Sequence, residues 1–322
     1  MKKARIAVVA LAVLMLFAAV SCKEPHVHSY GDPQAKDGKV VQVCECGDVK
    51  EVDGAVAVGS ADDLKDALNA DSKFVLITED IVLANTLTIS RDVEINLGGK
   101  SITAEGKRVL HITKGNVVLS GKGSIAITKD DEGNKDFKSS SVIRVGDNDG
   151  SESKLTEVCL TIGKDIVVSS DFTYGVTVFG SKTKETLIVD GTIKTKGVPA
   201  VSGNGSTAYR VADTTITING TVTTSEENAI YHPQKGRLTI NGVVEGNGGI
   251  EMKAGELVLS DSCTVKATAE TSSHKASSNG CSTSGYAIAL VYNKDYAGKA
   301  SLIGGLKGNV DESKVTYTIS DN

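Results

Sequence analysis

The chain has 322 residues, enough for one large domain or two of ordinary size, and 40% of them are hydrophobic, which excludes wholesale disorder. Its net charge of -5 argues against the clustered basic surface that nucleic-acid binding requires. Aromatic residues make up only 4%, whereas there are 34 Gly and 4 Pro, a balance that favours a thin aliphatic core between frequent turns.

The N-terminus has the pattern of an export signal. A positively charged start precedes an apolar run over residues 6–20, which is too short to be kept comfortably as a spanning helix. The small residues before Cys22 resemble the lipobox of bacterial lipoproteins, in which signal peptidase cuts before the Cys and its thiol is lipidated. Ala19 departs from that motif, so ordinary cleavage is the alternative. We expect a signal peptide over 1–21 and an extracytoplasmic chain anchored in the membrane through Cys22.

Residues 22–59 carry two pairs of potential metal ligands, His26 with His28 and Cys44 with Cys46. Four imidazole and thiolate donors are typical of a small tetrahedral zinc site, and four protein ligands leave no open position, so the zinc would be structural. The stretch resembles the short Cys/His modules of bacterial surface proteins. That resemblance also covers Tyr30, Gly47 and Glu51. The alternatives are a strained Cys44–Cys46 disulfide or two free thiols in a linker.

A short amphipathic helix is predicted over residues 60–68, where a capping-box-like start at Ser60 precedes apolar residues at helical spacing. The helix opens the third predicted region, residues 60–322. If that region is a β-solenoid, the helix is placed to cover the open sheet edges at its N-terminal end.

From residue 74 onward one phrase recurs at intervals of about 20 to 30 residues. It is clearest over residues 229–264, where an apolar-alternating segment, a Gly turn, a second strand and a third β-rich piece occur twice. The first coil is expected to use 74–77, 87–89 and 93–97. Later coils are expected to open at 109–112, 142–145, 176–178, 200–201, 229–230, 249–250 and 287–288. Their second strands are expected at 117–119, 160–162, 187–189, 216–218, 238–240, 257–259 and 301–303.

Three short strands per turn, stacked about 4.8 Å apart, predict an all-β fold, a parallel β-helix of about eight coils with loop insertions in its longer repeats. Asn219–Gly220 and Asn241–Gly242 follow second strands, where the sequence predicts turns with positive φ. The alternating residues 315–319 predict a last, half-exposed strand at the open end.

Phrases such as A-I-Y-x-P-x-x-G-x-L-T-I-x-G resemble the right-handed parallel β-helix, pectin-lyase-like superfamily. Within it the chain is similar to uncharacterised, carbohydrate-associated surface proteins of gut and oral bacteria. The resemblance covers residues 61–322 and bears on fold more than on activity. Enzymes of the superfamily use an Asp cluster, or acidic residues that hold Ca²⁺ beside an Arg or Lys base. The N-x-D, D-D, H-G, R-x-K and R-x-P-x-x-R motifs of its polygalacturonases and pectate lyases do not occur here in order, so no catalytic residue is assigned.

Aligning the opening strands places one column of outward positions on a single face: His111, Arg144, Thr177, Ala200, Tyr231, Glu251 and Ala289. A cation, an aromatic ring and an anion in one column could bind a sugar chain, so Arg144, Tyr231 and Glu251 are the predicted binding residues. The alternative is that outward positions are simply polar.

Two acidic insertions, at 130–136 and 147–149, offer oxygen ligands but lack the D-x-D-x-D-G frame, so Ca²⁺ is not expected there. Cys263 and Cys281 flank a Ser-rich insertion, and a disulfide between them would stabilise the fold by about 3 kcal/mol. Two buried thiols are the alternative. Cys159 is expected to be packed and unpaired.

These features together predict a non-catalytic, lipid-anchored protein of the outer membrane or cell surface. Its β-helix would serve as a spacer, adhesion surface or binding platform for polysaccharide or another surface protein. One alternative is a polysaccharide lyase or glycoside hydrolase with a divergent active site. Another is a filament subunit joined through the open C-terminal edge.

Overall fold

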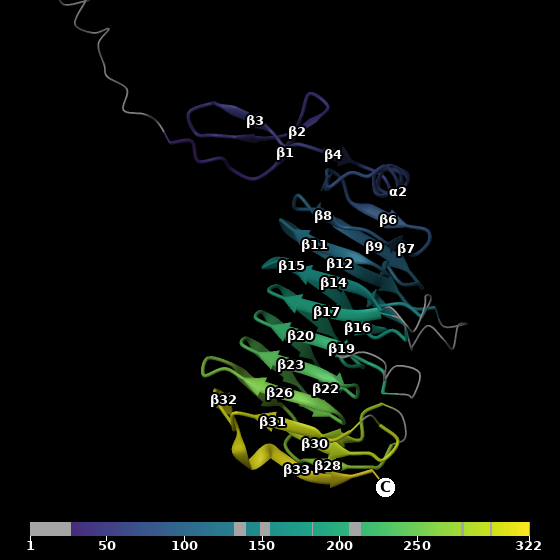
Figure 1. Cartoon of the computed structure of the whole chain (residues 1–322), viewed down its shortest axis with the longest axis vertical. Coiled ribbons are helices and arrows are strands. Elements are labelled where there is room, and N and C mark those ends of the chain that lie inside the picture. The colour runs from purple at the N-terminus through teal and green to yellow at the C-terminus, as the bar shows by residue number, and fades with distance from the viewer. Residues whose placement is uncertain are drawn as a thin grey trace, which may run out of the picture.

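The described part of the chain is built mainly from short strands that stack in parallel. A computed structural model describes residues 27–131, 140–148, 155–181, 183–205, 214–277, 280–296 and 298–321. Three long parallel sheets run along this part of the chain, and a small antiparallel sheet stands at its N-terminal tip (Figure 1). The architecture is all-β and consistent with a parallel β-helix. The predicted signal peptide, Cys22 and His26 lie outside the described residues.

Each repeat contributes one strand to each of the three sheets, so sequential neighbours within a sheet come from successive repeats. Sheet 1 contains β7 (Leu87–Ile89), β10 (Leu110–Ile112), β13 (Ser141–Val145), β16 (Tyr174–Val178), β19 (Val201–Ser202), β22 (Asn228–His232), β25 (Gly248–Met252), β30 (Ile288–Tyr292) and β33 (Val315–Ser320). Sheet 2 contains β4 (Ala55–Val58), β5 (Phe74–Ile77), β8 (Val93–Asn96), β11 (Gly115–Ser120), β14 (Thr156–Ile162), β17 (Thr183–Val189), β20 (Thr214–Ile218), β23 (Gly236–Ile240), β26 (Gly255–Leu259) and β31 (Ala300–Ile303). Sheet 3 contains β6 (Ile81–Leu83), β9 (Ser101–Glu105), β12 (Lys122–Lys129), β15 (Asp165–Ser170), β18 (Thr192–Thr195), β21 (Thr221–Thr224), β24 (Val243–Gly246), β27 (Thr264–Ala267) and β32 (Asn309–Val310).

The core consists of columns of aliphatic side chains that point inward from successive strands. In sheet 2 one such column follows the strand register directly: Leu119, Ile162, Val189, Ile218, Ile240 and Leu259. Each of these side chains is buried. Alternation along a strand sends every second residue into the core, so the apolar positions predicted from the sequence specify the register. The prediction of the second strands is confirmed.

Glycines after the sheet-2 strands let neighbouring turns approach closely. Neither Gly220 nor Gly242 has a positive φ, so the predicted reason for these glycines was wrong. A Cβ added to Gly242 would lie 2.0 Å from the carbonyl oxygen of Gly220, and one added to Gly220 would lie 2.0 Å from that of Gly191. The preceding asparagines form a ladder beside them, in which the Asn241 side-chain amide donates to Asn219 Oδ1 at 2.8 Å.

The two ends of the stack differ. At the N-terminal end, helix α2 (Ala61–Asn69) begins as predicted at Ser60, whose hydroxyl accepts from the Asp63 backbone N–H at 3.1 Å, and its apolar face is buried. Strand β4 precedes the helix and pairs in parallel with β5, so sheet 2 starts within the segment assigned to the Cys/His module. At the other end, the predicted last strand is present as β33, which pairs with β30, and Tyr317 on it is exposed.

Two smaller elements complete the description. The N-terminal sheet is formed by β1 (Gln34–Lys36), β2 (Lys39–Val43) and β3 (Val49–Glu51), which are antiparallel. The Ser-rich insertion forms a short antiparallel pair, β28 (Ser273–His274) with β29 (Thr283–Ser284), and η3 (Glu312–Lys314) is a single 3₁₀ turn before β33. Within the described residues, no helix has the length and apolar character needed to cross a membrane.

Candidate functional site

The predicted outward column of sheet 1 exists, with one change. Strand pairing places these residues side by side in order: His111, Arg144, Thr177, Ser202, Tyr231, Glu251 and Ala289. Ala200 was predicted in the place that Ser202 occupies. Val201 pairs with Ile230, so the next residue, Ser202, pairs with Tyr231 and takes this place in the column. Ala200 is fully buried.

Two of the three predicted binding residues are covered by other parts of the chain. Tyr231 is 5% exposed, and its hydroxyl lies 3.1 Å from that of Tyr296. Glu251 is 0% exposed, because it accepts hydrogen bonds from the backbone and hydroxyl groups of Ser282 and Thr283, at the base of the Ser-rich insertion. The expectation that these side chains face solvent was therefore wrong. The carboxylate of Glu251 holds the insertion against sheet 1, whereas the hydroxyl of Tyr231 contacts Tyr296 outside the insertion.

A buried lysine completes this internal network. Lys253 Nζ lies 2.7 Å from Asp321 Oδ2 and 3.5 Å from Glu251 Oε1, and it donates to the carbonyl oxygen of Gly280 at 3.0 Å. His274 Nε2 lies 2.8 Å from the other Asp321 oxygen. Burial raises the pKa of Asp321, but the hydrogen bonds from His274 and Lys253 and the charge of Lys253 outweigh it, so the pKa lies below its ordinary value. The sequence carried no signal for this network, since Lys253 reads as one more lysine in a strand.

The third predicted residue, Arg144, remains partly exposed on sheet 1. Its guanidinium carbon lies 4.8 Å from the centre of the Phe179 ring, a cation–π contact. Within the described residues, Arg144 Nε and Nη2, and also Nε of Arg108, are buried without a hydrogen-bond partner. Burial, together with the charge of Arg144, lowers the pKa of Arg108 to about 10. Arg108 is not among the predicted binding residues.

Two further titratable groups lie beside these arginines. His111 donates from Nε2 to the carbonyl oxygen of Gly146 at 3.0 Å, and burial followed by the charges of Arg144 and Arg108 lowers its pKa. Glu185 is 2% exposed, and burial raises its pKa to about 7. The hydrogen bond that Thr183 donates to the carboxylate and the charge of Arg144 both lower this pKa but do not outweigh burial. Perturbed groups that share one region are a common property of functional sites.

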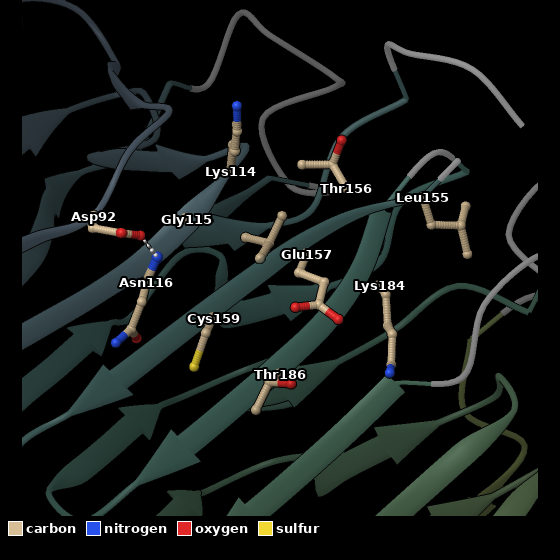
Figure 2. A pocket seen from close by; sticks show the side chains of 11 residues that line it. Asp92, Lys114, Gly115, Asn116, Leu155, Thr156, Glu157, Cys159, Lys184 and Thr186 are labelled. Carbon is tan, nitrogen blue, oxygen red and sulfur yellow. Dashed lines mark hydrogen bonds between the residues drawn. The ribbon is translucent and has the colours of Figure 1, made fainter. Parts of the chain in front are cut away.

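A second candidate surface is a shallow groove of about 840 Å³ on the outer side of sheet 2. Its lining residues are Asp92, Lys114, Gly115, Asn116, Leu155, Thr156, Glu157, Val158, Cys159, Lys184 and Thr186. Figure 2 shows side chains from β11, β14 and β17 projecting into it. Strand pairing puts Asn116, Cys159 and Thr186 in one row, and puts Glu157 beside Lys184. The groove contains none of the predicted binding residues.

The N-terminal sheet brings together three of the four predicted metal ligands. The donor atoms of His28, Cys44 and Cys46 all lie within 4.8 Å of one another, and His28 Nδ1 is 3.3 Å from Cys46 Sγ. The two cysteines face the same point because Gly47, with φ of 89°, turns the chain back so that its N–H donates to the Cys44 carbonyl oxygen at 2.8 Å. Two thiolates and an imidazole are the donor set that zinc prefers. The fourth predicted ligand, His26, lies outside the described residues.

Next to this cluster, Tyr30 donates a hydrogen bond from its hydroxyl to Asp48 Oδ2 at 2.6 Å. This bond raises the pKa of Tyr30 to about 12. His28 Nδ1 lies 3.7 Å from the same carboxylate oxygen. Asp48 and Cys46 therefore lie beside the same ring nitrogen of His28.

The predicted disulfide between Cys263 and Cys281 is not formed, and both residues are free. They lie in different parts of the fold. Cys263 follows the sheet-2 strand β26, and its thiol contacts the Lys307 carbonyl oxygen at 3.7 Å. Cys281 lies near Glu251 of sheet 1, where burial, followed by the charge of that carboxylate, raises the thiol's pKa. Of the two buried thiols expected as the alternative, Cys263 is buried and Cys281 is half-buried. Cys159 is free, as predicted, but it is half-buried and lines the sheet-2 groove rather than being packed in the core.

The acidic insertions fall mostly outside the described residues, since 132–139 and 149–154 are not among them. Of the described part, Asp147 accepts from the backbone N–H of Asn148 at 2.7 Å, and its own N–H donates to Thr183 Oγ1 at 3.0 Å.

Comparison with known proteins produced no match to any protein-family model, curated protein or solved structure.

Proposed function

We propose that the protein is a non-catalytic, glycan-binding component of the cell envelope. In this proposal a lipid on Cys22 anchors it at the outer membrane or cell surface, and a right-handed β-helix of about eight coils, capped by α2, forms the binding platform. The apolar run that ends before Cys22 supports the anchor. The parallel pairing of successive repeats and the buried apolar face of α2 support the capped β-helix.

The observation that carries the glycan proposal is the groove on sheet 2. Its floor presents amide, hydroxyl and charged groups from neighbouring strands, among them Asn116, Thr186, Glu157 and Lys184. Sugars bind through many such hydrogen bonds, and strands about 4.8 Å apart offer them at a regular spacing along a repeating polymer. Most of the groove's lining residues come from the three neighbouring strands β11, β14 and β17, which suits a chain molecule that crosses several strands better than a compact cofactor.

A structural zinc ion at the N-terminal sheet belongs to the same proposal. His28, Cys44 and Cys46, completed by His26, would hold it in a closed tetrahedron. Bound zinc would tie the loop before β1 to the turn between β2 and β3. A sheet this small has little core of its own, so a metal cross-link would stabilise the spacer between the anchor and the β-helix.

The test is a polysaccharide array probed with the purified chain, followed by product analysis of every retained glycan with and without Ca²⁺. We expect retention of at least one glycan, unchanged glycan length after incubation, and loss of retention for Asn116→Ala combined with Lys184→Ala. Retention of no glycan by a folded protein would overturn the proposal, and another surface protein would then become the better candidate partner.

An enzyme is the second candidate, and one observation favours it. Arg108, His111 and Glu185 all have shifted pKa values and lie near Arg144 on sheet 1. Of these groups, Glu185 has a pKa of about 7 and so can exchange a proton near neutral pH, as a lyase or hydrolase requires, while Arg108 stays charged. Shortened glycan products that disappear with Glu185→Gln would establish this function in place of the first.

A further inference from the structure

Sheet 1 carries a pair of arginines that the proposed glycan groove on sheet 2 does not use. We propose that Arg108 and Arg144 form a binding site for a tetrahedral oxyanion with two negative charges, which is either inorganic sulfate or phosphate or a phosphate group on a larger molecule. The two residues come from successive repeats: Arg144 lies on β13 beside His111, and Arg108 lies two residues before β10.

Unused hydrogen-bond donors are the first argument. Arg144 Nε and Nη2 and Arg108 Nε are buried, and none of them has a hydrogen-bond partner among the described residues. No carboxylate of that part of the chain lies within ion-pair distance of either guanidinium. Buried N–H groups are nearly always satisfied in folded proteins, so these donors point to an acceptor that the described residues do not supply.

Charge is the second argument. The charges of Arg108 and Arg144 act on each other and on His111, and each opposes a further positive charge in this region. Among the described residues, Asp147 acts on His111 through its charge, and Glu185 interacts with the charge of Arg144. Glu185 is buried and accepts a hydrogen bond from Thr183, so its carboxylate is already partly occupied. A dianion between the two guanidinium groups would remove their mutual repulsion.

Geometry is the third argument. The ring of Phe179 lies 4.8 Å from the guanidinium carbon of Arg144, a cation–π contact that limits the positions the fork can take. A fork held in one plane can offer two parallel N–H groups to one oxyanion, which is the arrangement by which arginine recognises sulfate and phosphate. His111 cannot compete for this role, since its Nε2–H already donates to Gly146.

The test is calorimetric titration of the whole purified chain with inorganic sulfate, with N-acetylglucosamine 6-phosphate and with acetate, in a chloride-free buffer at a pH where the phosphate monoester carries two negative charges. We expect sulfate to bind and acetate to bind at least about tenfold more weakly, because one negative charge cannot neutralise two guanidinium groups. Tighter binding of the phosphorylated sugar than of sulfate would identify a phosphate substituent as the ligand, whereas binding of inorganic sulfate alone would identify a free ion.

Variants separate this site from general attraction by positive charge. Arg144→Gln and Arg108→Gln should each weaken sulfate binding at least about tenfold, and Arg144→Lys should weaken it less, because lysine keeps the charge but loses the fork. Arg237→Gln is the matched control, since Arg237 is an exposed arginine already paired with Glu256 at 2.7 Å. Thermal melting shows whether each variant is folded. If Arg144→Gln does not fold, sulfate binding by Arg108→Gln tests the proposal.

Unchanged sulfate binding in a folded Arg144→Gln or Arg108→Gln variant would overturn the proposal, as would an equal loss in Arg237→Gln. Failure here leaves glycan binding at the sheet-2 groove intact, because none of the groove's lining residues belongs to this cluster.

Discussion

The ammonium of Lys253 lies 2.7 Å from the carboxylate of Asp321, although 68 residues separate the two, and both side chains are fully buried. Asp321 also contacts His274 in the Ser-rich insertion, and Lys253 lies 3.5 Å from Glu251. One ion-pair network thus fastens the insertion and the last residues of the described chain to sheet 1. It also explains why Glu251 does not face solvent, despite its outward position in the strand.

Removing the lysine should therefore destabilise the protein strongly. Lys253→Ala leaves two buried carboxylates without their cation, and breaking a buried pair in this way costs about 3–5 kcal/mol. The exposed pair of Arg237 and Glu256 has the same separation, 2.7 Å, and is the matched control. Arg237→Ala should cost less than about 1 kcal/mol because solvent screens the pair. Urea unfolding measures both, and equal losses would contradict the assigned role of Lys253.

Close approach at the glycine turns makes a second prediction. Gly242→Ala should lower the free energy of unfolding by about 1–3 kcal/mol, because the new methyl group would meet the Gly220 carbonyl oxygen. Gly197→Ala is the control, since its Cβ would lie 3.4 Å from the Glu226 side chain, an ordinary contact. It should change stability by no more than about 0.5 kcal/mol. Thermal or urea unfolding of the two variants compares them directly.

Glu185 should make stability depend on pH. Burial raises its pKa from 4.5 to about 7 in the folded protein, so between these values the folded state holds a proton that the unfolded state releases. Stability should therefore fall as pH rises from about 4.5 and level off above about 7, a loss of about 3 kcal/mol from this group. Glu185→Gln keeps the oxygen that accepts from Thr183 but cannot ionise. The variant should gain stability over the parent as pH rises through this window, and a constant difference between them would contradict the assignment.

Zinc binding can be measured without any knowledge of function. The purified chain should bind one zinc ion in competition with a chelating indicator. Cys44→Ser removes a metal ligand, so it should weaken zinc binding by more than the roughly 10- to 100-fold that is typical when a residue hydrogen-bonded to a ligand is lost. Cys159→Ser, which removes a free thiol in the sheet-2 groove, should bind zinc like the parent. His26→Ala should also weaken zinc binding if His26 is the fourth ligand. Undiminished zinc binding by Cys44→Ser would contradict the proposed zinc site.

The strands and their faces could be predicted from the sequence because alternation and repeat length are local signals. The column from His111 to Ala289 and the inward column from Leu119 to Leu259 both follow the expected register. The one misplaced residue is Ala200, which was aligned with Tyr231. In the structure Val201 pairs with Ile230, so Ser202 takes the place beside Tyr231. Repeats are easily misaligned where a strand is as short as β19.

The candidate site was far less predictable. Alternation shows that Tyr231 and Glu251 point away from the core, but it does not show that the Ser-rich insertion and Tyr296 fold over them. The disulfide between the cysteines that flank that insertion was predicted from their spacing along the chain. Spacing carries no information about the face of the fold on which each thiol lies. Arg108 and Lys253 could not be found because their importance comes from burial beside other charges.

The central claim, that the β-solenoid binds glycan on the outer face of sheet 2 without cleaving it, is tested most directly by calorimetric titration with the best glycan from the array. Asn116→Ala and Lys184→Ala should each weaken binding at least about tenfold, as loss of well-placed polar contacts does, while Thr239→Ala, on the same sheet outside this groove, should not. Product analysis of the same mixtures should show intact glycan. Equal affinity in all four proteins, or glycan shortened during the titration, would contradict the claim.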